Sequence, residues 1–259
     1  MTVFVLKLIA IITMMIDHFG AGLFLNLSNN WDIYTLLRSV GRVAFPIFAF
    51  LIANGCKHTK NIYRYMLRLG ILAIASEAFF DLYFWFQGVN FLRNTNIFYT
   101  LFLGTAGIFL YGAILKLAEK SSQELKTVPV NLMALLPALL IPVILAEVLS
   151  TDYAGAGVAL IILLYVFNTE NKLSRTALLL IGMFWLYARP IVSFARDGGL
   201  AVNFNGFNEW LFIFSLIPIL LIYFYNNKQG LNNAVLKWGF YVFYPLHIIF
   251  LLVVRDFWI

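Results

Sequence analysis

Long apolar runs, each close to the length of a membrane span, follow one another along almost the whole 259-residue chain. A helix of about 20 residues crosses a hydrocarbon core of roughly 30 Å, and lipid offers no partner to an unpaired backbone group. Hydrophobic residues make up 62% of the chain and charged residues 12%. A soluble globular protein is about half apolar and about a quarter charged. The sequence therefore predicts an all-α fold, a polytopic transmembrane helical bundle.

Nine segments reach or approach the length of a membrane span, so we expect nine to ten membrane helices in a single domain over residues 1–259. The segments are 3–27, 36–56, 63–87, 97–117, 129–149, 153–168, 175–195, 209–226 and 235–255. The sixth is short for a span. The remaining connections leave no room for a soluble domain.

Basic residues fall mainly in alternate connections, near Lys57, Lys116, Lys172 and Lys228. Because cytoplasmic loops of membrane proteins carry an excess of lysine and arginine, this pattern predicts a cytoplasmic N-terminus. We interpret the formal charge of +6 as membrane topology rather than as a nucleic-acid surface. The expected location is a bacterial cytoplasmic (inner) membrane, with multiple passes, membrane lipid as a partner and no nucleic acid.

Charged residues interrupt the first two apolar segments in their outer halves. Asp17 and His18 lie in IITMMIDHFGAGLF, and Arg38 and Arg42 lie in LLRSVGRVAFP. The two arginines are spaced i, i+4 and so share one helix face. An aspartate at the bilayer centre costs about 2.5–3.5 kcal/mol on insertion scales, which requires a partner or a water-filled cavity.

Further polar groups occur at similar depths in other segments. Glu77 and Asp81 form a second i, i+4 pair in SEAFFDL, His247 follows Pro245, and Arg189 ends the seventh segment. Buried charges at one depth should face a shared interior rather than lipid. We therefore predict a polar chamber that opens toward the outer face.

Histidine titrates near neutral pH, so His18 is the candidate general base of this chamber. Either Asp17 or Glu77 could orient it, and Arg42 could pair with either acid. A structural ion pair that fixes helix packing is the alternative for each of these pairs. No metal cluster and no P-loop, GxGxxG, GxSxG or CxxC motif is present, so no metal is predicted.

The motifs IDH, GRVAFPIFAFLIANG, SEAFFDL and YPLH occur in this order, near the two ends of the chain. Together with their flanks they resemble the TraX family of integral membrane proteins over close to one third of the chain. The family takes its name from a protein that acetylates the N-terminus of pilin. It is related to the broader acyltransferase-3 class of membrane acyltransferases.

The resemblance implies a membrane acyltransferase-like domain, an enzyme that moves an acetyl or other acyl group from cytoplasmic acyl-CoA to an amine or hydroxyl at the membrane or outer face. Acetyl-CoA would be the donor. The acceptor is open and could be a protein N-terminus, a glycan or a small molecule, and the oligomeric state is not readable.

The resemblance also implies roles for individual residues. The expected catalytic residues are His18, Asp17, Glu77 and Arg42. The expected substrate-binding residues of the chamber are Arg38, Asp81, His247 and Arg189. The basic residues expected to face the phosphates of CoA are Lys57, Lys60, Arg64 and Arg68.

Two other functions fit the residues. Buried acids and histidines can relay protons in a proton-coupled small-molecule transporter, and proline-interrupted helices can line its pathway. No paired halves or repeated broken helices favour it. A non-catalytic membrane scaffold would make the buried charges purely structural.

Overall fold

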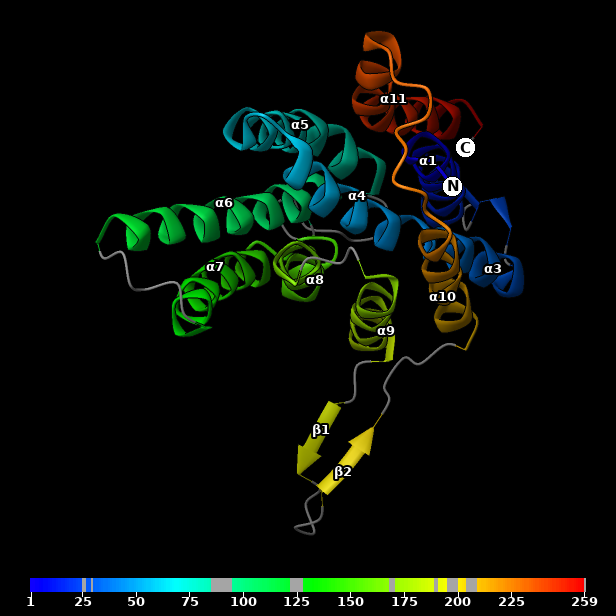
Figure 1. Ribbon diagram of the computed structural model, residues 1–259. Helices are drawn as coiled ribbons and strands as arrows, with labels where there is room; N and C mark the ends of the chain where they lie inside the picture. The colour runs from blue at the N-terminus through cyan, green and yellow to red at the C-terminus, as the bar shows by residue number, and fades with distance from the viewer. Residues whose placement is uncertain are drawn as a thin grey trace. The chain divides into compact units, whose positions relative to one another are not determined.

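The computed structural model describes residues 1–24, 27–28, 30–84, 95–121, 128–167, 171–188, 191–194, 200–203 and 209–258. Helices make up almost all of this part of the chain, together with one short hairpin (Figure 1). The expected helical class is thus confirmed.

Within the described residues, five segments are long and apolar enough to cross a membrane. They are Val3–Phe24, Trp31–His58, Ile97–Lys120, Val130–Val148 and Ala234–Phe257. The chain is therefore a membrane protein by the character of its helices. The larger number of nine to ten spans and the cytoplasmic N-terminus stay predictions.

The chain divides into two compact units, which are described separately. Unit 1 comprises 1–48 and 172–259, and unit 2 comprises 49–171. A single functional domain over the whole chain stays a prediction.

Unit 1 joins the two ends of the chain. Its elements are α1 (Val3–His18), η1 (Phe19–Phe24), α3 (Trp31–Gly41), the start of α4 (Ala44–His58), α9 (Lys172–Ala188), β1 (Ile191–Phe194), β2 (Leu200–Asn203), α10 (Glu209–Tyr223) and α11 (Ala234–Trp258). Helix α1 packs against α3 and α11, and α10 packs against α3 and α9. These contacts bring the first helix and the last helix side by side.

The start of α1 is held by the segment before α11. The Thr2 side chain caps α1 by accepting from the backbone N–H of Val5. The backbone N–H groups of Val3 and Phe4, which have no partner inside the helix, donate to the carbonyls of Lys228 and Gln229 at 2.9 and 3.0 Å. The helix therefore begins at a defined residue.

The second candidate span is interrupted between α3 and α4. The backbone N–H groups of Arg42 and Val43 donate three residues back, to the carbonyls of Ser39 at 3.0 Å and Val40 at 3.2 Å. Pro46 follows in the first turn of α4, where a missing N–H costs no helical hydrogen bond. Arg42 thus stands at a bend between two helices.

The seventh segment is shorter than predicted. Helix α9 ends at Ala188, and β1 begins at Ile191 and pairs antiparallel with β2. The helix expected through residue 195 is therefore wrong in its last part. The cause is readable in the sequence, since the residue before Pro190 is disfavoured in the α conformation.

Unit 2 is a helical bundle. It contains the rest of α4, then α5 (Ile62–Phe84), α6 (Ile97–Ser121), α7 (Val128–Val148) and α8 (Ala154–Val166). Helix α6 packs against α5, α7 and α8, and so forms its centre.

Two glycines let the neighbours of α6 approach closely. A Cβ atom at Gly104 would lie 2.8 Å from Ile161 of α8. A Cβ atom at Gly107 would lie 2.7 Å from the backbone oxygen of Ala138 in α7 and would overlap Ile162 of α8. Small residues at such contacts are typical of helix packing in membranes.

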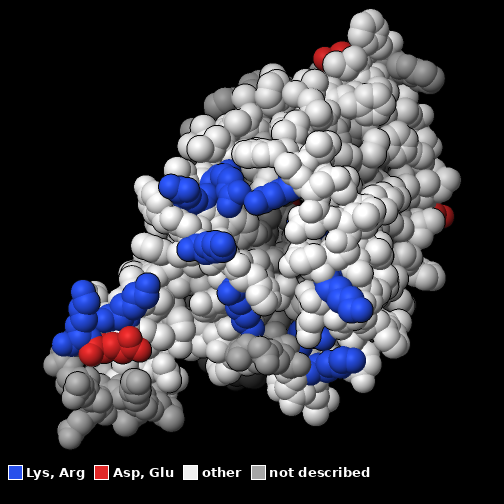
Figure 2. All heavy atoms as spheres, turned by 45° about the horizontal axis from the view of Figure 1, so that its top comes forward, with Lys and Arg blue, Asp and Glu red and all other residues white. Residues whose placement is uncertain are grey.

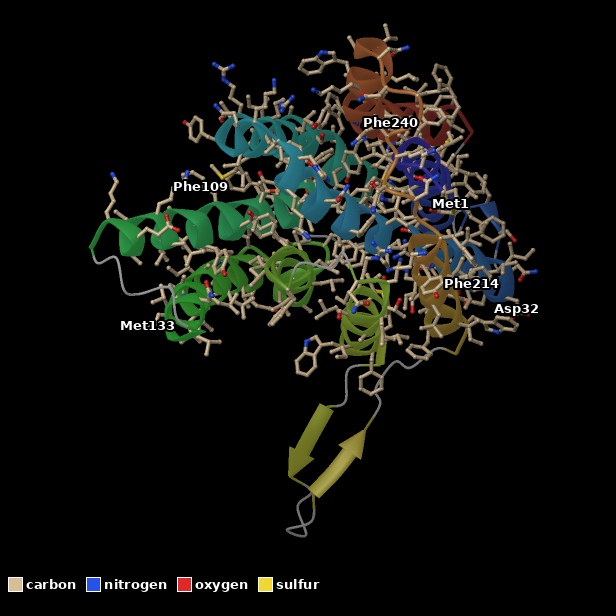
Figure 3. The ribbon with its side chains drawn as sticks, in the orientation of Figure 1. Met1, Asp32, Phe109, Met133, Phe214 and Phe240 are labelled. Atoms are coloured by element: carbon tan, nitrogen blue, oxygen red, sulfur yellow. The ribbon has the colours of Figure 1, made fainter. Side chains whose placement is uncertain are left out.

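Helix α7 carries large apolar side chains on its outer face. Met133, labelled in Figure 3, is 70% exposed, and Leu136, Leu140 and Ile144 are also exposed. They recur at helical spacing, whereas Ala134 and Ala138 are fully buried. This arrangement is typical of a helix whose outer face contacts lipid.

Candidate functional site

Two histidines from opposite ends of the chain meet in unit 1. His18 is the last residue of α1, and His247 lies within α11. Nδ1 of His18 lies 2.7 Å from Nε2 of His247, and the two rings are inclined by only 11°. The residues are 6% and 4% exposed. Because the two rings are shielded from water, the groups around them determine which ring nitrogens carry protons.

Aromatic rings and a backbone carbonyl enclose the histidine pair. The Tyr244 ring meets both imidazoles edge-on, with centroids 6.0 Å from His18 and 5.3 Å from His247. The Phe243 ring lies parallel to His247 at 5.1 Å, and its carbonyl oxygen lies 3.0 Å from His247 Nδ1. These contacts define the orientation of the His247 ring.

A π-helical turn follows the first histidine directly. Element η1 begins at Phe19, next to His18. π-turns inside helices are frequent at functional sites. Gly20 lies in this turn, and a Cβ atom there would come within 2.7 Å of the Leu37 side chain on α3. The glycine thus allows α3 to lie close to the end of α1.

Asp17 joins two arginines from α3 and its C-terminal end. Its Oδ2 accepts from Arg38 at 2.7 Å, and its Oδ1 accepts from Arg42 at 3.0 Å. The side chains of Asp17 and Arg42 are 13% and 14% exposed, and that of Arg38 is 28% exposed. Gly41 provides the necessary space, because any Cβ atom there would overlap the Asp17 carboxylate.

Arg42 is fixed by two further contacts. Its Nε donates to the carbonyl of Arg38 at 3.1 Å, and its guanidinium carbon lies 5.9 Å from the centroid of the Tyr187 ring on α9. The second contact has the geometry of a cation–π interaction. We use the name polar centre for Asp17, His18, Arg38, Arg42 and His247.

The polar centre combines two kinds of chemistry. Guanidinium groups suit carboxylates and phosphates, and the Asp17 carboxylate offsets part of their charge here. A hydrogen-bonded imidazole pair can accept a proton, hold it and pass it on. The arrangement is therefore suited to acid–base chemistry on a polar substrate.

The two acids of α5 lie in unit 2. Glu77 Oε2 accepts from both the backbone N–H and the side-chain amide of Asn96, and this amide also donates to the carbonyl of Ala73 at 2.8 Å. Asp81 is 3% exposed, and among the described residues neither of its carboxylate oxygens has a hydrogen-bond partner. The Glu77 carboxylate thus holds the start of α6 through Asn96, whereas Asp81 makes no such hydrogen bond to the described residues.

Alanine substitutions at Glu77 and Asp81 should show which of the two acids stabilises unit 2 through its hydrogen bonds. Glu77→Ala leaves the buried donors of Asn96 without their acceptor, and we expect the free energy of unfolding to fall by about 2 kcal/mol. Asp81→Ala removes a desolvated carboxylate without breaking such a bond, and we expect a change within about 1 kcal/mol. Cys56, the sole cysteine, is 6% exposed in the same unit, so its labelling by a thiol dye on heating reports unfolding. Equal losses in the two variants would contradict the distinction.

The basic residues predicted to face CoA gather at the turn between α4 and α5. Lys57 lies in the last turn of α4, Lys60 in the connection, and Arg64 and Arg68 in α5. Nε of Arg68 donates to the carbonyl of Arg64 at 3.1 Å. Their contact with CoA stays a prediction.

The predicted site residues that the structure describes therefore fall into two sets, one in each unit. His18 contacts His247, and Asp17 contacts Arg38 and Arg42, all within unit 1. Glu77 and Asp81 belong to unit 2. Arg189 lies outside the described residues. Within the described part of the chain, no group of three or more His, Cys, Asp and Glu side chains has metal-site geometry.

Sequence reasoning missed three supporting residues, namely Gly41, Asn96 and Tyr187. Asn96 carried a usable signal, because it directly precedes a predicted helix start, where asparagine is a favoured N-cap. Its Oδ1 accepts from the backbone N–H of Phe98 at 2.9 Å. Nothing in the sequence distinguishes Tyr187 from the other aromatic residues.

Comparisons with known proteins give one family and one relative. The family model described as "TraX protein" matches residues 3–255. A protein of Dichelobacter nodosus, described as "Probable fimbrial assembly protein FimC, serogroup H1", is 29% identical over 251 residues, which cover 95% of this chain and 92% of that protein. No solved structure matches the chain.

Proposed function

Since the chain belongs to the TraX family, we propose that it acts on pilin at the bacterial inner membrane during the assembly of a pilus. The observation that carries this proposal is the extent of the likeness, because the family model covers residues 3–255. The relative described as a probable fimbrial assembly protein likewise aligns along 95% of the chain.

This proposal corrects the broader function expected from the sequence. A general acyl-CoA-dependent acyltransferase with an open acceptor is wrong, because the family and the fimbrial relative point to a pilin-related role. The expectation came from the wider acyltransferase-3 class, whose relation to this chain stays a prediction. Neither a transporter nor a scaffold fits these relatives better.

The family is linked to acetylation of pilin, so acetylation of the pilin subunit is the reaction we propose to test. The polar centre supports such a reaction through the buried imidazole of His18, which can take a proton from an amine. Acetyl-CoA as the donor remains an untested prediction.

The distribution of basic side chains supports one orientation of the chain in the membrane. Basic side chains far outnumber acidic ones on the face drawn in Figure 2. Because lysine and arginine favour the cytoplasmic side, we propose that the turn with Lys57 and Lys60 is cytoplasmic. This orientation implies a cytoplasmic N-terminus as well, because two candidate spans, Val3–Phe24 and Trp31–His58, separate it from the turn.

The test is complementation in a piliated strain from which this gene has been deleted. We expect His18→Ala to behave like the deletion, with acetylation of the pilin N-terminus reduced about 100-fold or more and surface pili reduced. The matched control is His58→Ala, since His58 lies exposed at the end of α4. The measurements are intact mass of purified pilin, electron microscopy of pili and abundance of each variant in the membrane.

Two results would overturn this assignment. The first is a deletion strain with unchanged pilin mass and normal pili, which removes the pilin-related role. The second is full complementation by His18→Ala, which removes His18 from the reaction while leaving a pilin-related role in place.

A further inference from the structure

The hydrogen bonds of the histidine pair determine which nitrogen of each ring carries a proton. His247 Nδ1 lies 3.0 Å from the carbonyl oxygen of Phe243. A carbonyl oxygen can only accept, so Nδ1 of His247 must carry the hydrogen. A neutral imidazole has a single N–H group, and Nε2 of His247 is therefore an acceptor.

The same reasoning extends to the first histidine. Nδ1 of His18 lies 2.7 Å from Nε2 of His247, which is closer than face-to-face ring contact permits, so the nearly parallel rings meet edge to edge. Since Nε2 of His247 accepts, Nδ1 of His18 donates. Neutral His18 then carries its hydrogen on Nδ1 and its lone pair on Nε2.

We propose that His247 is a positioning residue that holds His18 in the Nδ1–H form and so makes His18 Nε2 the base of the site. The inference rests on the proposed function, because it assigns the base that acts on the pilin amine. In hydrolase triads, a carboxylate fixes the histidine tautomer in the same way. Here the Asp17 carboxylate binds Arg38 and Arg42, and an imidazole takes the position of the orienting acceptor.

The step assigned to His18 is one proton transfer. An N–H bond of the protonated pilin amine breaks, and an Nε2–H bond forms on His18, which leaves a neutral amine and an imidazolium. The Nδ1–H of His18 stays in place, and its bond to His247 Nε2 becomes charge-assisted and therefore stronger. The step needs no other reactant.

The tautomer can be read directly by ¹⁵N NMR of the imidazole side chains in the purified full-length chain in detergent micelles. The chain contains three histidines, so His58→Asn leaves only the pair of interest and simplifies assignment. We expect His18 to carry its proton on Nδ1 in this background. A proton on Nε2 of His18 would overturn the proposal.

Two substitutions at position 247 then test the cause. His247→Phe removes the imidazole acceptor of His18 Nδ1, and we expect His18 to shift to the Nε2–H form that free imidazole side chains favour in water. In His247→Gln the amide oxygen can take the place of Nε2, and we expect the Nδ1–H form to be retained. An Nδ1–H form retained in His247→Phe would also overturn the proposal. If the His247→Phe variant does not fold, the tautomer measured with His247 present is the deciding result.

Pilin acetylation in cells gives an independent readout. We expect a loss of about 100-fold or more for His247→Phe and substantial rescue in His247→Gln. Because the tautomer is measured without substrate, failure of the proposed function can be distinguished from failure of the role assigned to His247. Unchanged pilin in the deletion strain overturns only the proposed function, whereas the wrong tautomer overturns only the role of His247.

Discussion

Asp17→Ala is expected to lower the free energy of unfolding by about 3 kcal/mol. The carboxylate neutralises two guanidinium groups, at 2.7 Å from Arg38 and 3.0 Å from Arg42. Its removal leaves two like charges close together in a largely buried site. Breaking a buried pair on one side costs far more than the pair itself contributes.

The matched control for Asp17 is an acid of the same unit whose own side chain is exposed, although its arginine partner is buried. Asp256 contacts Arg255 at 2.9 Å, but its side chain is 60% exposed. We expect Asp256→Ala to cost less than about 1 kcal/mol, because water solvates the carboxylate. Tryptophan fluorescence during thermal unfolding in detergent would compare the two variants. Similar losses would show that burial does not determine the strength of the Asp17 contacts.

Gly107→Leu should disrupt the packing of unit 2. A side chain at this position meets the backbone oxygen of Ala138 and the side chain of Ile162. Because a backbone oxygen cannot rotate away, α6 and α7 must separate. Overpacking of this kind costs about 3 kcal/mol, toward the upper end of the usual range.

Gly112→Leu is the control on the same helix, since in the described part of the chain no atom outside the local helix backbone lies within 4 Å of a Cβ atom there. We expect this variant to be as stable as the wild type or more stable by about 0.5–1 kcal/mol, because leucine is a better helix former than glycine. Labelling of Cys56 on heating reports both variants, since this residue lies in unit 2. Destabilisation by Gly112→Leu as large as that by Gly107→Leu would contradict the packing argument.

Helix positions could be predicted well from local sequence. The fourth and fifth segments were expected to begin at 97 and 129, and α6 and α7 begin at Ile97 and Val128. Both are long apolar runs preceded by polar residues, so hydropathy alone locates them. Hydropathy alone does not locate the break at Arg42, because an apolar run continues directly after it with Val43, Ala44 and Phe45.

The site could be predicted only in part. The i, i+4 spacing placed Arg38 and Arg42 on one face, and the structure gives both of them Asp17 as a partner. The sequence could not choose between Asp17 and Glu77, because this choice depends on which helices pack together. The same limit applies to the contact between His18 and His247, which are 229 positions apart.

The fit of Asp17 over Gly41 has a consequence for the divergence of related proteins. An aspartate at 17 leaves no volume for a side chain at 41, so a change at position 41 should be selected against while the acid is present. A smaller residue at 17 removes that restriction. In a set of related sequences the two positions should therefore covary, with glycine at 41 retained wherever 17 is acidic.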